Sequence, residues 1–140
     1  MSLKIEVYMP LLPITALYAA LLALILLHLA FQVVKVRQRH KAGLGHKNDE
    51  LLVAGRNHAN AAEYIPITLI LFALAELNGA SNLILHIIGC VFLSARIIHA
   101  WGFTTSKGLT HPGRYWGTVG TFVCLIVLAL LNLYLSWPYL

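Results

Sequence analysis

The chain contains four apolar stretches, each about as long as the roughly 20 residues that a helix needs to cross a membrane. They cover residues 10–34, about 50–77, about 82–103 and about 113–135. Only 11% of the residues are charged and 59% are hydrophobic, whereas a soluble domain carries about 25% charged residues. We therefore predict an all-α membrane protein whose single domain, residues 1–140, is a four-helix transmembrane bundle with up-down topology.

Basic residues are concentrated in two of the three connections between these stretches. The first connection contains Lys35, Arg37, Arg39, Lys41 and Lys47, and Lys107 and Arg114 lie in or next to the third. The polar turn 78–82 has no charge. The positive-inside rule predicts that residues 35–50 and 104–113 are cytoplasmic and that both termini lie on the opposite side. The basic residues flank apolar stretches and no nucleic-acid-binding motif occurs, so we expect contact with the lipid bilayer and no nucleic-acid partner.

Polar side chains interrupt the second apolar stretch, where a carboxylate costs roughly 2.5–3.5 kcal/mol on insertion scales. Three of them are spaced i, i+4, i+7 and share a helix face: Arg56, Asn60 and Glu63. Arg96 and His99 share a face of the third stretch. At about 1.5 Å per residue, counted from the turn 78–82, Glu63 and Arg96 lie at one depth of an antiparallel helix pair.

Two interpretations of this polar group remain open from the residues alone. In the first, Glu63 and Arg96 form a buried ion pair that fixes the helix register. In the second, the excess of arginines, which includes Arg114, binds a small polyanion while Glu63 binds its ammonium group. The second interpretation is favoured, because a register device needs only one pair. No metal site is expected, since Cys90 and Cys124 lack the spacing of a metal-binding motif.

The motif Arg56-x3-Asn60-x2-Glu63-Tyr64-x-Pro66 resembles the second-helix signature of the MAPEG family, the membrane-associated proteins in eicosanoid and glutathione metabolism. The resemblance implies a homotrimer that binds glutathione between adjacent subunits. It assigns glutathione binding to a set of residues in the second and third helices: Arg56, Asn60, Glu63, Tyr64, Arg96 and His99. It assigns activation of the thiol to Arg114. Phe103 departs from the pattern, because some members have a tyrosine there.

The resemblance thus implies a glutathione-dependent transferase, with peroxide reduction as a further activity, that acts on a lipophilic electrophile from the membrane. Glutathione would be a co-substrate, and no metal would take part. Two alternatives remain open at this point. One is a small membrane transporter or channel that uses Glu63 as an ion or proton site. The other is a membrane subunit of the same family that has no catalytic activity.

Overall fold

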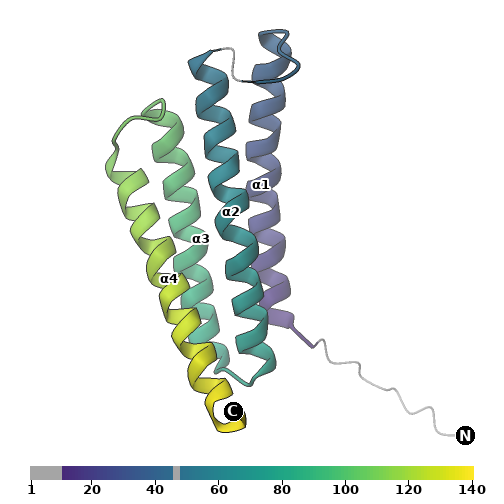
Figure 1. Cartoon of the computed structure of the whole chain (residues 1–140), viewed down its shortest axis with the longest axis vertical. Helices are drawn as coiled ribbons and strands as arrows, with labels where there is room; N and C mark the ends of the chain where they lie inside the picture. Colours follow the sequence, from purple (N-terminus) through teal and green to yellow (C-terminus); the bar gives the residue numbers. More distant parts are fainter. Residues whose placement is uncertain (1–10, 46–47) are drawn as a thin grey trace, which may run out of the picture.

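The computed structural model describes residues 11–45 and 48–140, which form an up-down bundle of four helices (Figure 1). The helices are α1 (Pro13–Arg39), α2 (Asp49–Leu77), α3 (Asn82–Thr105) and α4 (Pro112–Ser136), and a 3-10 turn, η1 (Trp137–Tyr139), follows α4. The described residues contain no strand. All four helices are long and apolar enough to cross a membrane. The predicted all-α, four-helix fold is therefore confirmed.

The first connection is shorter than predicted, because α1 continues beyond residue 34 as far as Arg39. Basic side chains are favourable in the last turn of a helix, where the carbonyl groups carry partial negative charge. Their long aliphatic stems also let the charged ends reach the polar head groups. Arg37 fixes the end of the helix by donating a 2.7 Å hydrogen bond to the Gly43 carbonyl. The predicted connection 35–50 thus begins only at residue 40.

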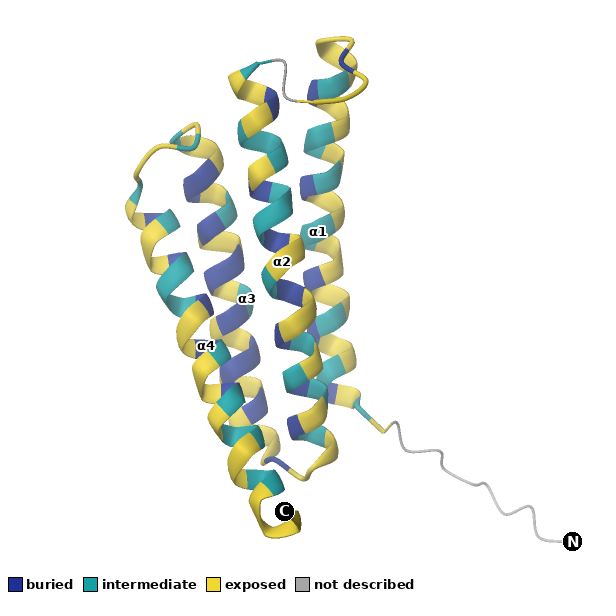
Figure 2. Cartoon of the chain, viewed as in Figure 1, coloured by how far each residue is buried: buried dark blue, intermediate teal, exposed yellow. Residues whose placement is uncertain are grey.

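Most large side chains on the outer surface of the bundle are apolar and exposed, as expected for a surface that contacts lipid (Figure 2). Leu24, Leu130 and Leu133, for example, are each more than 60% exposed. In water such a surface would be unfavourable over so large an area, but in hydrocarbon it costs nothing. The two basic connections lie at one end of the bundle, and the turn 78–81 and the C-terminus lie at the other (Figure 1). This arrangement agrees with the predicted topology.

Small residues bring α3 and α4 close together at the end that carries the basic connections. A Cβ atom added to Gly117 would lie 2.6 Å from the Ala95 carbonyl oxygen, which is too close for any side chain. One added to Gly120 would lie 2.9 Å from the Ala95 Cβ atom. The two glycines therefore let the backbone of α4 pack against α3. This packing places the start of α4, which carries Arg114, next to the polar face of α3.

At the opposite end of the bundle, Glu76 of α2 holds the start of α1. Its two carboxylate oxygens accept hydrogen bonds from the Ile14 amide (3.0 Å), the Thr15 amide (2.7 Å) and the Thr15 hydroxyl (2.6 Å). The first amides of a helix have no partner within the helix and favour a negative charge. Glu76 therefore supplies, from a second helix, the cap that the Leu12 side chain cannot provide.

Candidate functional site

Arg96 lies inside the bundle, on the side of α3 that faces α2 and α4. Its side chain is almost completely buried, with 1% of its surface exposed. One terminal nitrogen, Nη2, donates to Asn60 Oδ1 on α2 at 2.8 Å, and Nη1 donates to Thr121 Oγ1 on α4 at 3.3 Å. The guanidinium carbon lies 6.0 Å from the centre of the Tyr64 ring. Neutral groups from two neighbouring helices therefore surround this cation.

Arg96 has no carboxylate partner within 4.0 Å in the part of the chain that the structure describes, where the ion pairs are Arg39–Glu50 and His40–Glu50. Two buried nitrogens in this region, Arg96 Nε and His99 Nδ1, also lack a hydrogen-bond partner among the described residues. A buried charge without a counter-ion is unfavourable, because its hydration is lost without compensation. The site therefore combines a buried positive charge with two buried nitrogens that have no partner among the described residues.

Glu63 lies at the centre of α2 and is exposed on the surface of the single chain. Among the described residues it forms no ion pair within 4.0 Å. The interpretation of Glu63 and Arg96 as a buried ion pair is therefore wrong for this structure. The predicted depth is nonetheless close, since Arg96 contacts Asn60 and Tyr64, which lie on either side of Glu63 along the helix.

The remaining predicted residues of α2 form a border between the core and the surface. Arg56 is exposed, whereas Asn60 and Tyr64 are half-buried. His99 of α3 is buried, with 3% of its surface exposed, and its ring centre lies 5.8 Å from that of Phe103. The structure thus brings Asn60 and Tyr64 together with Arg96. Arg56 stays exposed on the same face of α2 as Glu63.

Two residues that support the site were not predicted. Asn57 is buried and donates from Nδ2 to the Ala100 carbonyl and to Thr104 Oγ1, both at 3.0 Å. Thr121 is also buried and accepts the hydrogen bond from Arg96. Asn57 lies in the same polar run as Arg56, and its position one residue further along turns it toward α3. For Thr121 the only signal is a hydroxyl group in an apolar stretch.

Arg114 lies at the start of α4 and is half-buried. Its Nη1 atom donates to the Gly108 carbonyl at 2.6 Å and to the Leu109 carbonyl at 3.3 Å. The guanidinium carbon lies 4.5 Å from the centre of the Phe103 ring. Both hydrogen bonds use Nη1, so Nη2 and Nε have no hydrogen-bond partner in the described chain. Beside Arg114, a cavity of about 570 Å³ opens between the connection and the first turns of α4.

Comparison with known proteins identifies the family. The model of the MAPEG family matches residues 15–134. The chain belongs to the MAPEG family. Its relatives include the inner membrane protein YecN of Escherichia coli strain K12, which is 38% identical over 126 residues, or 89% of this chain and 94% of YecN. YecN of Escherichia coli strain CFT073 matches equally well. With its four membrane-crossing helices, this MAPEG protein is an integral multi-pass membrane protein.

Proposed function

We propose that this MAPEG protein is a glutathione-dependent transferase that acts on lipophilic electrophiles within the membrane. The observation that carries the proposal is the position of Arg96, a buried cation whose partners among the described residues are all neutral, close to the exposed Glu63, which forms no ion pair with those residues. Glutathione has two carboxylates and one ammonium group. A carboxylate of glutathione can therefore pair with the exposed Arg56 in the positive potential of Arg96, and its ammonium group can pair with Glu63.

The burial of each side chain suggests its role. Arg56 and Glu63 are exposed, so they can contact a carboxylate and the ammonium group of glutathione directly. Arg96 is covered by Asn60 and Tyr64, and we assign it a positioning role: it orients the Asn60 amide and adds positive potential behind the ligand. His99 lies in the same buried layer.

The polar face of α2 is exposed in the single chain, although charged groups are unfavourable against hydrocarbon. A second copy of the chain would cover Arg56 and Glu63 and enclose a ligand between the subunits. The homotrimer that the resemblance implies satisfies this requirement, because each subunit of a closed ring covers the next one. The proposed site is therefore complete only in the oligomer.

The proposed chemistry is attack by the glutathione thiolate on an electrophilic carbon of the second substrate. A carbon–sulfur bond forms, and the leaving group departs with its electron pair or, in an addition, the acceptor takes a proton from water. The thiolate is the reactive form, and a nearby guanidinium favours it over the thiol. Two nitrogens of Arg114, Nη2 and Nε, form no hydrogen bond with the described residues, and one of them can donate to the sulfur.

Binding and turnover of the purified protein in detergent test this assignment. Calorimetry should detect glutathione binding, and Glu63→Gln should weaken it roughly tenfold to a hundredfold, since one charged hydrogen-bonded pair is lost. Glu50→Gln, on the exposed end of the same helix, serves as the matched control and should leave binding unchanged. Absence of glutathione binding by the wild-type protein would contradict the proposal.

Arg114→Ala should affect turnover more than binding, because its interaction strengthens as charge develops on the sulfur. We expect conjugation of a generic aromatic electrophile to fall about a hundredfold or more. The ultraviolet absorbance of bound thiolate should also appear only at higher pH. Arg114→Lys, which keeps the charge, should restore part of both signals. If Arg114→Ala leaves the thiolate titration and turnover unchanged, another cation activates the thiol.

The exposed position of Glu63 at the centre of α2 also fits a transporter or channel, since intramembrane carboxylates mark ion pathways. Vesicles that contain the purified protein separate the two functions. A transporter would carry a solute or protons across the vesicle membrane without glutathione, and Glu63→Gln would abolish this flux. Glutathione binding without turnover of any electrophile would instead identify a member of the family that has no catalytic activity.

A further inference from the structure

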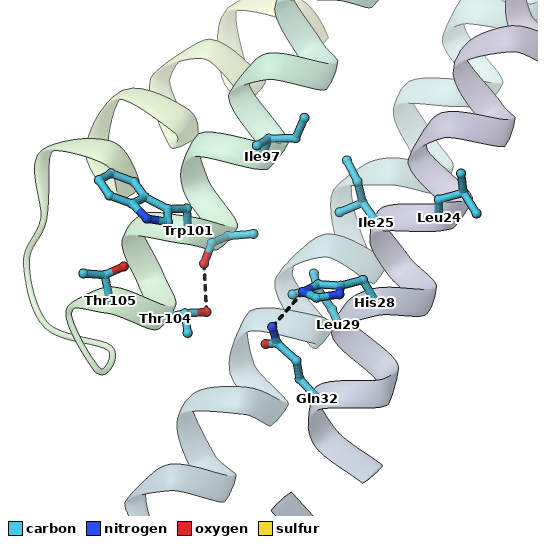
Figure 3. Close-up of a pocket in the computed structure, with 10 residues that line it drawn as sticks. Leu24, Ile25, His28, Leu29, Gln32, Ile97, Trp101, Thr104 and Thr105 are labelled. Atoms are coloured by element: carbon cyan, nitrogen blue, oxygen red, sulfur yellow. Dashed lines mark hydrogen bonds between the residues drawn. The ribbon is translucent and has the colours of Figure 1, made fainter. Parts of the chain in front are cut away.

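A groove lies between α1 and α3 (Figure 3), and none of the residues predicted to bind glutathione lines it. It has a volume of about 440 Å³ and is open on one side. Its lining is mainly apolar and includes Ile25 on α1 and Ile97 on α3, while the Trp101 ring extends toward the α4 side, where its centre lies 5.0 Å from that of His111. The polar groups on its α1 wall are His28 and Gln32, whose side chains share a 2.8 Å hydrogen bond. The groove thus suits an alkyl chain that runs along the bundle.

The apolar groove continues into a charged cavity at the end of the bundle that carries the basic connections. The two spaces share Gln32 and Thr104, and the second has a volume of about 740 Å³. Three basic and two acidic side chains line it: Lys35, Arg39, Lys107, Asp49 and Glu50. A molecule that extends through both spaces would therefore have an apolar part and a polar, ionic end.

Two lysines of this cavity have no carboxylate partner among the described residues. Arg39 Nη1 lies 2.5 Å from Glu50 Oε1, and His40 Nε2 lies 2.8 Å from Glu50 Oε2, so Glu50 is satisfied by these partners. Lys35 and Lys107 form no ion pair within 4.0 Å in the described chain. Asp49 lies in the first turn of α2, where the partial positive charge of the helix start stabilises it. Outside the Arg39–Glu50 pair, Lys35, Lys107 and Asp49 therefore give the cavity a net positive charge.

The backbone at the helix ends gives a second observation about lysines at the end of the bundle that carries the basic connections. Helices α1, α2 and α3 end in the same hydrogen-bond pattern, with a residue of positive φ at Lys41, Gly79 and Lys107 respectively. Glycine adopts this conformation without steric cost, and a lysine does not. Glycine occurs at the uncharged end of the bundle, while both caps at the basic end are lysines. Both caps therefore add positive charge at the basic end, and that of Lys107 lies in the charged cavity.

We propose that the α1–α3 groove is a binding site for an anionic phospholipid of the surrounding bilayer. Its phosphate lies in the charged cavity against Lys35 and Lys107, its ester groups lie level with Gln32, and one acyl chain follows Leu24 and Ile97. A phospholipid joins an anionic head to an apolar chain, which matches the order of the two connected spaces. Anionic lipids are attracted by about 1 kcal/mol per basic residue near the membrane surface, or roughly fivefold in affinity.

The proposal can be tested by quenching of Trp101 fluorescence, since the Trp101 side chain lines the groove. A reporter variant with Trp116→Phe and Trp137→Phe keeps Trp101 as its one tryptophan. It is placed in phosphatidylcholine vesicles that contain a small fraction of either brominated phosphatidylglycerol or brominated phosphatidylcholine. We expect the anionic lipid to quench Trp101 several-fold more efficiently at the same mole fraction. Equal quenching by both lipids would overturn the proposal.

Matched variants locate the effect. A second reporter that keeps only Trp116, which is 65% exposed on α4, should show no preference between the two lipids. Lys35→Gln with Lys107→Gln should remove the preference of Trp101. Lys41→Gln removes the same charge from an equivalent helix cap outside the cavity and should retain the preference.

A second copy of the chain is the competing occupant of the groove. It would shield Trp101 from both brominated lipids, so that each would quench Trp101 less than it quenches Trp116. That result would also overturn the proposal.

Discussion

The partners of the buried Arg96 guanidinium among residues 11–45 and 48–140 are an amide, a hydroxyl group and an aromatic ring. A residue retained for stability alone would be expected to have a carboxylate partner, or to be apolar. Buried charges without such a partner occur at sites where a ligand or a reaction needs them, at a cost in stability. We therefore regard Arg96 as a functional residue that destabilises the bundle.

Replacement of Arg96 by methionine tests this view. Methionine has a similar length and no charge, so the loss of the desolvation penalty should offset the two lost hydrogen bonds. We expect the melting temperature in detergent to stay the same or to rise, while glutathione binding weakens. Arg96→Lys, which keeps a buried charge but cannot contact Asn60 and Thr121 together, should melt below Arg96→Met. A drop of several degrees in Arg96→Met would show that the arginine is structural.

The spacing of residues along the sequence predicted the depth of the site better than the direction of its side chains. Counting from the turn placed Arg96 at the level of Glu63, and in the structure Arg96 contacts Asn60 and Tyr64, which lie on either side of Glu63 along α2. The count could not show that Glu63 is exposed, because the rotation of a helix about its axis is set by the packing of every residue on it. The same packing turns Asn57 toward α3 and places Thr121 of α4 next to Arg96. Neither residue was therefore predicted from the sequence.

At the scale of the helices, charged residues at the two ends of α2 differ in what they contribute. Glu76 accepts three hydrogen bonds from the first turn of α1 and is half-buried. Glu50 accepts bonds from Arg39 and His40 in an exposed position, where solvent screens the interaction. The first residue is therefore a cap that joins two helices, and the second is a surface pair.

Glu76→Gln should lower the free energy of unfolding by about 1–2 kcal/mol, because an uncharged amide accepts fewer and weaker hydrogen bonds from the helix start. Thermal or denaturant unfolding in detergent measures the change. Glu50→Gln is the control on the same helix and should have little effect. Thr15→Val, which removes only the hydroxyl donor, should cost less than Glu76→Gln. Equal stability of Glu76→Gln and wild type would contradict the assigned cap.

The helix ends show what the sequence could not determine at this scale. The uncharged length of the first apolar stretch predicts a membrane span, but α1 continues through Lys35 and Arg37 to Arg39. Hydropathy reports where a helix leaves the hydrocarbon, not where its hydrogen bonds stop. The stop of α1 depends on the positive φ at Lys41 and on the bond from Arg37 to the Gly43 carbonyl, and neither has a distinct sequence signal.

In the whole molecule, the count of four helices and the placement of charge support each other. With four spans, the α1–α2 and α3–α4 connections must share one side of the membrane, and both carry basic residues (Figure 1). The turn 78–81, with its glycine cap, and the C-terminal residues carry no charge and share the other side. If only one of α2 and α3 crossed the membrane, the two basic connections would lie on opposite sides.

The asymmetry predicts the orientation of the protein in the membrane. Lys and Arg in short loops favour the cytoplasmic side, because their transfer across the membrane is unfavourable. Reporter domains fused after residue 45 and after residue 108 should therefore report the cytoplasm, and one fused after residue 80 should report the opposite side. Removal of the charges at Lys35, Arg37 and Arg39 should lower the fraction of molecules with this orientation, since these residues contribute most of the basic charge at the end of α1. A cytoplasmic signal from the fusion after residue 80 would contradict the orientation. It would also move the proposed lipid site, which requires Lys35 and Lys107, to the other leaflet.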